Sequence, residues 1–300
     1  MTLLITGAWR YTDAQLDEIR ALGHEVVLMP DERGELPCEA DKIEGVICNG
    51  LFLYHSIESF KRLKYIQLTS AGFDRVPMDY VNKNGIKIHN ARGVYSIPMA
   101  EFALCGVLDI YKHSRFFHDN QKAHNWVKNR EILEIYGKSV LIVGAGNVGT
   151  ECAIRFKAFG ARVRGVDLYP RDDGNYEAIL PLRELHRELT LADIVVLTLP
   201  LTEDTRRIFN RAAFSAMKSG AVLVNIARGA VVDTDAMIEA LSSGNLGGAV
   251  LDVFDPEPLD EQSPLWSLPN VILTPHNSFV GDGNTDRLFI VIKNNLECGI

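Results

Sequence analysis

The chain has 300 residues, 47% hydrophobic and 23% charged, which is an ordinary composition for a globular protein of two domains. Its formal net charge of -8 at pH 7 argues against nucleic acid or an anionic membrane as its main partner. The sequence has no apolar run long enough to span a membrane, no signal peptide at MTLLITGAWR and no CxxC pair among its five scattered cysteines, so we expect a cytoplasmic protein with reduced thiols.

The N-terminal part of the chain alternates short apolar stretches with helical patterns. Helices are predicted near residues 14–22 and 56–63. The predicted strands lie at residues 3–6, 25–29, 45–48, 65–68 and 86–89. This alternation indicates one α/β unit of ordinary domain size.

A long helix is predicted from about residue 97 to beyond residue 115, with Pro98 in its first turn. A second run of strands follows, at residues 140–143, 162–167, 194–197, 221–225, 248–251 and 271–273. A final helix is predicted at about residues 286–297, where the chain could return to the first unit. The fold class is therefore α/β, with two Rossmann-like domains, parallel sheets and a substrate cleft between them.

A glycine pattern follows directly on the strand at residues 140–143. Gly144, Gly146 and Gly149 stand at a strand-to-helix turn, and Asp167 closes the next strand, which is the context of a dinucleotide-binding site. The first glycine permits the tight turn, the second lets a pyrophosphate approach the backbone, and the third lets the helix pack on the strand. A structural turn that merely needs positive φ is the alternative, and the complete βαβ context argues against it.

Asp167 indicates which dinucleotide is bound. A carboxylate at this position can accept hydrogen bonds from the adenosine ribose and would repel a 2′-phosphate, which favours NAD over NADP. Arg171 could offset that repulsion, although we interpret it as a solvated loop residue.

Three further residues follow predicted strands of the second unit: Arg228, Glu257 and His276. Each of them alone would be more common as a surface or loop residue. At the carboxyl ends of strands beside a dinucleotide turn, however, they suit chemistry, because Arg can clamp a carboxylate with two hydrogen bonds and His can move a proton. A carboxylate beside the His would favour imidazolium and fix its tautomer.

The motifs GAGNVG, TLPLT, NIARG, LDVFDPEP and TPH, in this order and spacing, resemble those of the D-isomer-specific 2-hydroxyacid dehydrogenases. The similarity runs through the whole chain and includes SAGFD at 70–74 and MAEFAL at 99–104. It implies an NAD-dependent enzyme that moves hydride between NAD(H) and a small 2-hydroxy or 2-keto acid such as glyoxylate, hydroxypyruvate or phosphoglycerate. It also implies a flavodoxin-like substrate domain (1–96 with 283–300) and an NAD domain (97–282).

The resemblance assigns roles to single residues, and it requires no metal. His276 would be the acid/base, Glu257 its partner, and Arg228 the residue that binds the substrate carboxylate and polarises the keto oxygen. The backbone N–H groups of Ala71 and Gly72 would hold the other end of that carboxylate. The remaining contacts with NAD would come from Asn147, Val148, Asp167, Pro200, Ala227 and Asp252, with Asp252 near the nicotinamide amide. Ser278, which departs from the family pattern, is a further candidate for a contact with the cofactor.

The sequence departs from the family pattern after His276, where Asn277, Ser278 and Phe279 replace small apolar residues. In the loop after the third strand, Leu51, Phe52 and Tyr54 favour an apolar or aromatic wall at the substrate rather than a phosphate pocket. Arg75 keeps a phosphorylated substrate open.

Two alternatives remain, an NAD-sensing corepressor-like binding protein of the same fold and a relative that oxidises formate or phosphite. Corepressors of this type usually carry long disordered extensions, and formate enzymes tend to have Gln at the position of Glu257. The resemblance also implies a homodimer joined through the NAD domain, with residues 116–126 at the contact and Trp126 packed there.

Overall fold

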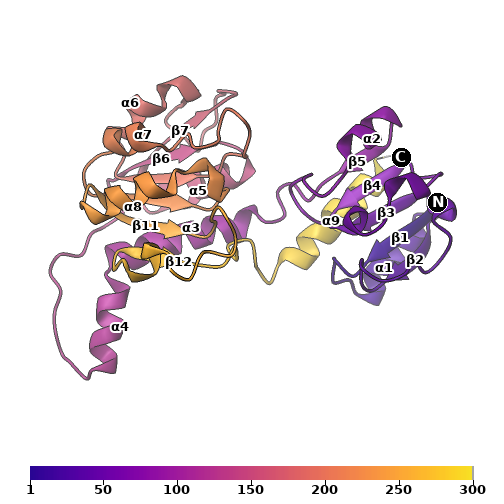
Figure 1. Cartoon of the computed structure of the whole chain (residues 1–300), viewed down its shortest axis with the longest axis horizontal. Helices are drawn as coiled ribbons and strands as arrows, with labels where there is room; N and C mark the ends of the chain where they lie inside the picture. Colours follow the sequence, from indigo (N-terminus) through magenta and orange to yellow (C-terminus); the bar gives the residue numbers. More distant parts are fainter. Residues whose placement is uncertain (299–300) are drawn as a thin grey trace. The chain divides into compact units, whose positions relative to one another are not determined.

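The computed structural model describes residues 1–298 and divides them into two compact units. The first unit is Met1–Tyr95 together with the segment from Gly281, and the second is Ser96–Val280. Both units are built on parallel sheets with helices (Figure 1), so the predicted α/β class with two Rossmann-like domains is confirmed. Gly299 and Ile300, the end of the predicted segment 283–300, lie outside the described residues. Within residues 1–298 no helix combines the length and apolarity that a membrane crossing needs.

The first unit has a five-stranded parallel sheet in the order β2-β1-β3-β4-β5, which is the flavodoxin-like order. Its helices pack on both faces, so the strands are apolar on both sides. On one face, Leu288, Ile292 and Leu296 share one stripe of the last helix, and Phe289 stacks on Trp9 with ring centroids 6.0 Å apart. The elements of this unit are β1 (Thr2–Thr6), α1 (Asp13–Ala21), β2 (Glu25–Met29), β3 (Gly45–Cys48), β4 (Tyr65–Leu68), α2 (Met78–Lys83), β5 (Lys87–His89) and α9 (Asn284–Glu297).

The second unit has a seven-stranded parallel sheet in the order β12-β11-β10-β9-β6-β7-β8. Side chains alternate between the two faces, so Leu141 and Val143 enter one core while Val140 and Ile142 enter the other. The strand order reverses between β6 and β9, and α/β sheets bind ligands at the carboxyl ends of strands at such a point. The strands are β6 (Ser139–Val143), β7 (Arg162–Asp167), β8 (Ile179–Pro181), β9 (Ile194–Leu197), β10 (Ala221–Asn225), β11 (Leu246–Leu251) and β12 (Val271–Leu273).

Helices cover both faces of this second sheet (Figure 1). One of them, α3, lies close to β11, because a Cβ at Gly106 would come within 2.6 Å of Val250 Cγ1. The helices are α3 (Ser96–Tyr111), α4 (Ser114–Lys122), α5 (Asn147–Ala158), α6 (Leu185–Leu189), α7 (Arg211–Ala216) and α8 (Thr234–Ser242).

The prediction of one continuous helix from 97 to beyond 115 is wrong. The helix breaks after Tyr111, and His113 adopts the left-handed conformation with φ 52° before α4 begins. No Gly or Pro marks the break, and Tyr111 is the last buried side chain of α3, whereas none in α4 is buried. Helix α4 and the loop after it extend away from the sheet of the second unit (Figure 1).

The helix predicted at 56–63 is also wrong, since only a 3₁₀ turn, Ile57–Ser59, forms there. Ile57, Phe60 and Leu63 are all buried and stand three residues apart, which is the repeat of a 3₁₀ turn. The short elements α2, β8, α6 and α7 were not predicted, because their apolar patterns are too brief to detect, and neither was the longer α8.

Candidate active site

The three glycines lie between β6 and α5, as predicted, and two of them have no room for a side chain. Gly144 has φ +100°, and a Cβ on it would lie 2.5 Å from the backbone nitrogen of Leu199. A Cβ on Gly149 would lie 2.2 Å from the carbonyl oxygen of Gly144. Gly146 differs, because a Cβ there would meet no atom within 4 Å, so its backbone faces open space.

The open side of Gly146 adjoins the N-terminus of α5. Gly146 is the N-cap, and Asn147 and Val148 begin the helix, whose first N–H groups have no partner within the helix. Open space beside free N–H groups and the positive end of a helix dipole fits a pyrophosphate. The residues present therefore fit the phosphates of a dinucleotide.

Asp167, at the end of β7, holds this turn in place. Its Oδ2 accepts a hydrogen bond from the Ala145 nitrogen at 2.7 Å, and its Oδ1 accepts one from the Tyr169 nitrogen at 2.9 Å. Arg171 is an exposed loop residue, as interpreted, but its side chain also contacts the turn. Its guanidinium donates to the Ala145 carbonyl and lies 3.6 Å from Asp173 Oδ2.

A small cavity of about 40 Å³ lies beside the glycine turn, and Gly144, Asp167 and Pro200 are among the residues that line it. The sequence analysis missed Thr198, whose hydroxyl donates to the Gly144 carbonyl at 2.6 Å. Its position directly after β9 in TLPLT was the available signal. This bond ties the loop after β9 to the turn after β6, across the point where the strand order reverses.

The adjacent strands β10, β11 and β12 bring together the three segments with Arg228, Glu257 and His276. Arg228 is exposed, and its Nη1 donates to the Ala227 carbonyl at 2.7 Å. The next residue, Gly229, packs against the segment after β11, because a Cβ there would lie 1.9 Å from the Phe254 carbonyl carbon. That glycine lets the NIARG turn lie directly on the backbone that leads to Glu257.

Glu257 and His276 form the pair expected from the sequence. Nδ1 of His276 lies 2.9 Å from Glu257 Oε2, while Glu257 Oε1 accepts a bond from the Phe254 nitrogen at 3.0 Å. His276 has φ 50°, and both side chains of the pair are partly exposed. The carboxylate thus makes Nδ1 the donor and leaves Nε2 for another partner.

Asp252 is fully buried beneath this pair. Its Oδ1 accepts bonds from the Thr274 hydroxyl and the Asn277 nitrogen, both at 2.7 Å, and its Oδ2 accepts one from the Ser278 nitrogen at 2.9 Å. Ser278 is itself 2% exposed. The polar residues after His276 therefore use their backbone N–H groups to anchor the segment on a buried carboxylate.

In the first unit, the structure changes the interpretation of the loop after β3. Leu51 is fully buried in the core, so its side chain cannot form the expected apolar wall; Phe52 is partly buried, and Tyr54 is 55% exposed. Glu32, which the sequence analysis missed, accepts bonds from the backbone nitrogens of Asn49 and Gly50, both at 2.7 Å. No sequence signal marks Glu32, because its partners come from a distant strand end.

The turn after β4 holds Ala71 and Gly72. The Asn90 side chain donates to the Ala71 carbonyl at 2.6 Å, and the Ser70 hydroxyl donates to the Gly72 carbonyl at 3.1 Å. Both carbonyls are thus fixed by side chains, which sets the orientation of the peptide groups in this turn.

Comparison with known proteins identifies the family. The model of the D-isomer specific 2-hydroxyacid dehydrogenase NAD binding domain matches residues 104–278, more than half of the chain. A glyoxylate reductase from Thermococcus gammatolerans is 31% identical over 91% of this chain and 85% of its own. A D-3-phosphoglycerate dehydrogenase from Methanocaldococcus jannaschii is 34% identical over 73% of this chain, but the match spans only 42% of that longer protein.

Solved structures of similar proteins contain dinucleotides. A D-lactate dehydrogenase from Aquifex aeolicus, solved with NAD and lactic acid, has a TM-score of 0.77 and 26% identity, covering 99% of this chain and 95% of that one. A D-isomer specific 2-hydroxyacid dehydrogenase from Xanthobacter autotrophicus, solved with NADPH and MES, has the same TM-score and coverage at 28% identity. The chain therefore belongs to the D-isomer specific 2-hydroxyacid dehydrogenases, and it is an NAD-binding oxidoreductase that acts on CH–OH donors.

Proposed function

We propose that the chain reduces small 2-keto acids to D-2-hydroxy acids with NADH, with glyoxylate, hydroxypyruvate or phosphohydroxypyruvate as candidate substrates. The observation that carries this proposal is the His276–Glu257 pair, which follows β11 and β12, together with Arg228 after the adjacent strand β10. An acid/base His, a carboxylate that orients it and a guanidinium together suit the reduction of a carbonyl next to a carboxylate.

The chain's own residues would act as follows. Arg228 would bind the substrate carboxylate and stabilise negative charge on the keto oxygen. The bond from Nδ1 to Glu257 leaves Nε2 of His276 to donate a proton to that oxygen. Bound NADH supplies the hydride. Asp252 would act as a positioning residue, since its carboxylate already has three partners within the protein.

For the cofactor, we propose contacts with the phosphates from the backbone of the Gly144–Gly149 turn, with Asn147 and Val148 at the start of α5. Asp167 would accept hydrogen bonds from the ribose and favour NAD over NADP. Pro200, Ala227, Asp252 and Ser278 remain proposed neighbours of the cofactor.

For the substrate, we propose that the backbone N–H groups of Ala71 and Gly72 bind its carboxylate and that Phe52 and Tyr54 contact its apolar part. The predicted substrate domain (1–96 with 283–300) and NAD domain (97–282) would then correspond to the first and second units, whose bounds differ by one or two residues. We further propose a homodimer in the cytoplasm, consistent with the five cysteines being free thiols.

The test is the oxidation of NADH, followed at steady state with glyoxylate, pyruvate, hydroxypyruvate, 2-ketoisocaproate and phosphohydroxypyruvate. We expect turnover with at least one of the five. Binding of NADH without turnover on any of them would overturn the proposal and would favour the corepressor-like function.

A further inference from the structure

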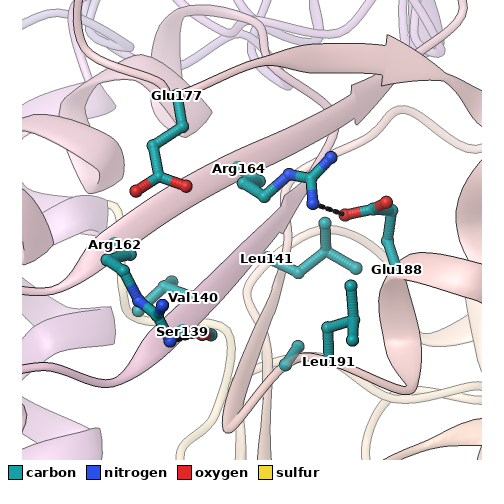
Figure 2. A pocket seen from close by; sticks show the side chains of 9 residues that line it. Ser139, Val140, Leu141, Arg162, Arg164, Glu177, Glu188 and Leu191 are labelled. Carbon is teal, nitrogen blue, oxygen red and sulfur yellow. Dashed lines mark hydrogen bonds and ion pairs between the residues drawn. The ribbon is translucent and has the colours of Figure 1, made fainter.

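A second cavity, of about 210 Å³, opens at the N-terminal ends of strands in the second sheet (Figure 2). Ser139 and Arg162, which line it, are the first residues of β6 and β7. The glycine turn and Asp167 lie at the opposite ends of the same strands, roughly 16 Å away at 3.3 Å per residue. The cavity is therefore separate from the dinucleotide turn and from the His276 pair.

The charged residues in this cavity balance each other. Arg162 and Arg164 come from β7, Glu177 from the segment before β8, and Glu188 from α6. Arg162 Nη2 donates to the Ser139 hydroxyl at 2.8 Å, and Arg164 Nη1 lies 3.1 Å from Glu188 Oε2. Two positive and two negative groups thus share one small space.

Glu188 shows that this arrangement is incomplete. Its side chain is only 2% exposed, yet its Oε1 has no hydrogen-bond partner within residues 1–298. A buried carboxylate oxygen without a donor is unfavourable, and native structures normally provide such an atom with a partner. This oxygen is closed to solvent in the structure, so a small shift of the Glu188 side chain towards a donor brought by a ligand would complete the site.

The rest of the wall is apolar. Figure 2 shows the Arg164 guanidinium directed at the Glu188 carboxylate, with Leu141 and Leu191 beneath this pair. A ligand here would therefore meet guanidinium donors, carboxylate acceptors and an aliphatic surface together.

We propose that this cavity binds a small zwitterion, namely an α-amino acid with a short side chain. Its carboxylate would pair with Arg162 and Arg164, its ammonium would donate to Glu188 and Glu177, and its side chain would contact Leu141 and Leu191. A phosphate would be repelled by the two carboxylates, and a simple cation by the two guanidinium groups. The cavity is below the size usual for drug-like ligands, which fits an amino acid.

Isothermal titration calorimetry of the full chain tests the proposal without requiring turnover. The probes are glycine, L-alanine and L-serine, with propionate and 1-propylamine as ligands that carry only one of the two charges. We expect saturable binding of one amino acid per chain, and binding at least about tenfold weaker for both single-charge probes.

Variants assign the binding to this cavity. Arg164→Gln and Glu177→Gln should each weaken binding of the best amino acid, by about tenfold and about threefold respectively. Glu177 is exposed, so its substitution leaves the fold intact even if the exchange at Arg164, whose partner Glu188 is buried, does not. Arg183→Gln, at a side chain 79% exposed and outside the cavity, is the matched control and should bind as the wild type does.

Two results would overturn the proposal. One is the absence of a binding signal for all three amino acids up to about 10 mM. The other is binding that survives both cavity substitutions but disappears in Arg228→Lys, which would place the amino acid at the proposed reaction site. Every readout in these experiments is binding of an amino acid. The amino-acid proposal can therefore fail while the reductase activity is confirmed, and the reductase activity can be absent while amino-acid binding is confirmed.

Discussion

Glu257 links His276 to the backbone of the loop that carries Glu257. One carboxylate oxygen lies 2.9 Å from Nδ1 of His276, while the other accepts a bond from the Phe254 nitrogen at 3.0 Å. The imidazole is therefore oriented by a side chain that is itself fixed, and proton transfer from a positioned group depends on such orientation.

We expect His276→Ala to reduce kcat for the best keto acid by at least about a hundredfold, the lower end for loss of a general acid. Glu257→Gln keeps the shape of the partner but removes its charge, so its kcat should fall less than that of His276→Ala. Steady-state kinetics measure both, with the Kd of NADH as the control that should stay unchanged. Near-wild-type turnover in His276→Ala would refute the assignment.

Asp252→Asn should lower kcat and destabilise the loop after β12. The carboxylate accepts two backbone N–H groups and one hydroxyl, and an amide offers only one acceptor oxygen, so at least one buried donor loses its partner. We expect the free energy of unfolding to fall by about 1–3 kcal/mol, measured by urea denaturation. If Asp252 also contacts the cofactor directly, the Kd of NADH will rise along with the loss of kcat. Unchanged stability and kcat would contradict the positioning role.

Asp167→Ala should shift the preference from NADH towards NADPH, because it removes the charge that would repel a 2′-phosphate. The measurement is the ratio of kcat/KM for the two cofactors. The substitution also removes the bond to the Ala145 nitrogen, so activity with both cofactors should decline as the glycine turn loosens. Arg171→Ala is the companion variant. A wild-type enzyme that favours NADPH would contradict the prediction and would make Arg171 the proposed ligand of the 2′-phosphate.

The stability of the second unit should depend on pH through Asp193. Burial alone would raise the pKa of this carboxyl, but the bonds from Lys218 Nζ at 2.6 Å and the Ser139 nitrogen at 2.9 Å hold its pKa below the usual value. A group with a lowered folded pKa contributes stability above its unfolded pKa of about 3.9, and that stability is lost as the pH falls through the folded pKa. Urea denaturation between pH 7 and about pH 3 should therefore show a shallower decline for Asp193→Asn than for the wild type. Asp41→Asn, at an exposed aspartate, is the control and should leave the dependence of the free energy of unfolding on pH unchanged. Parallel pH profiles for Asp193→Asn and the wild type would contradict this account.

Assembly should depend on the apolar side chains of α4 and the following loop. Phe117 is 41% exposed, Trp126 98% and Tyr136 78%, and several exposed apolar side chains on one segment favour a protein contact there, whereas single ones are common on protein surfaces. Trp126→Ser combined with Phe117→Ser should convert a dimer into a monomer in light scattering at micromolar concentration. Trp266→Ser, at a tryptophan 54% exposed elsewhere on the second unit, is the matched control. A wild-type chain that is already monomeric would refute the predicted dimer.

The sequence by itself determined the fold class and the chemical class of this protein. Parallel strands buried on both faces have nearly continuous apolar sequences, so β6, β9, β10 and β11 were predicted within a residue or two. The glycine turn could also be predicted from the sequence, because only glycine fits at positions 144 and 149. Arg228, Glu257 and His276 stood out because each lies in a segment that follows a strand, and the carboxyl ends of adjacent parallel strands meet at one end of the sheet.

Tertiary structure decided the rest. The break after Tyr111 has no local signal, because it depends on where the helix stops finding a core to pack against. Leu51 was assigned to a substrate wall from its position in a loop, yet burial in the core of the first unit removes it from any surface. The roles of Asp252, Thr198 and Glu32 rest on hydrogen bonds to backbone groups from other strands, and no spacing in the sequence records such partners. Pairing of the Arg164 and Glu188 side chains beside Leu141 likewise exists only once β6, β7 and α6 have packed together.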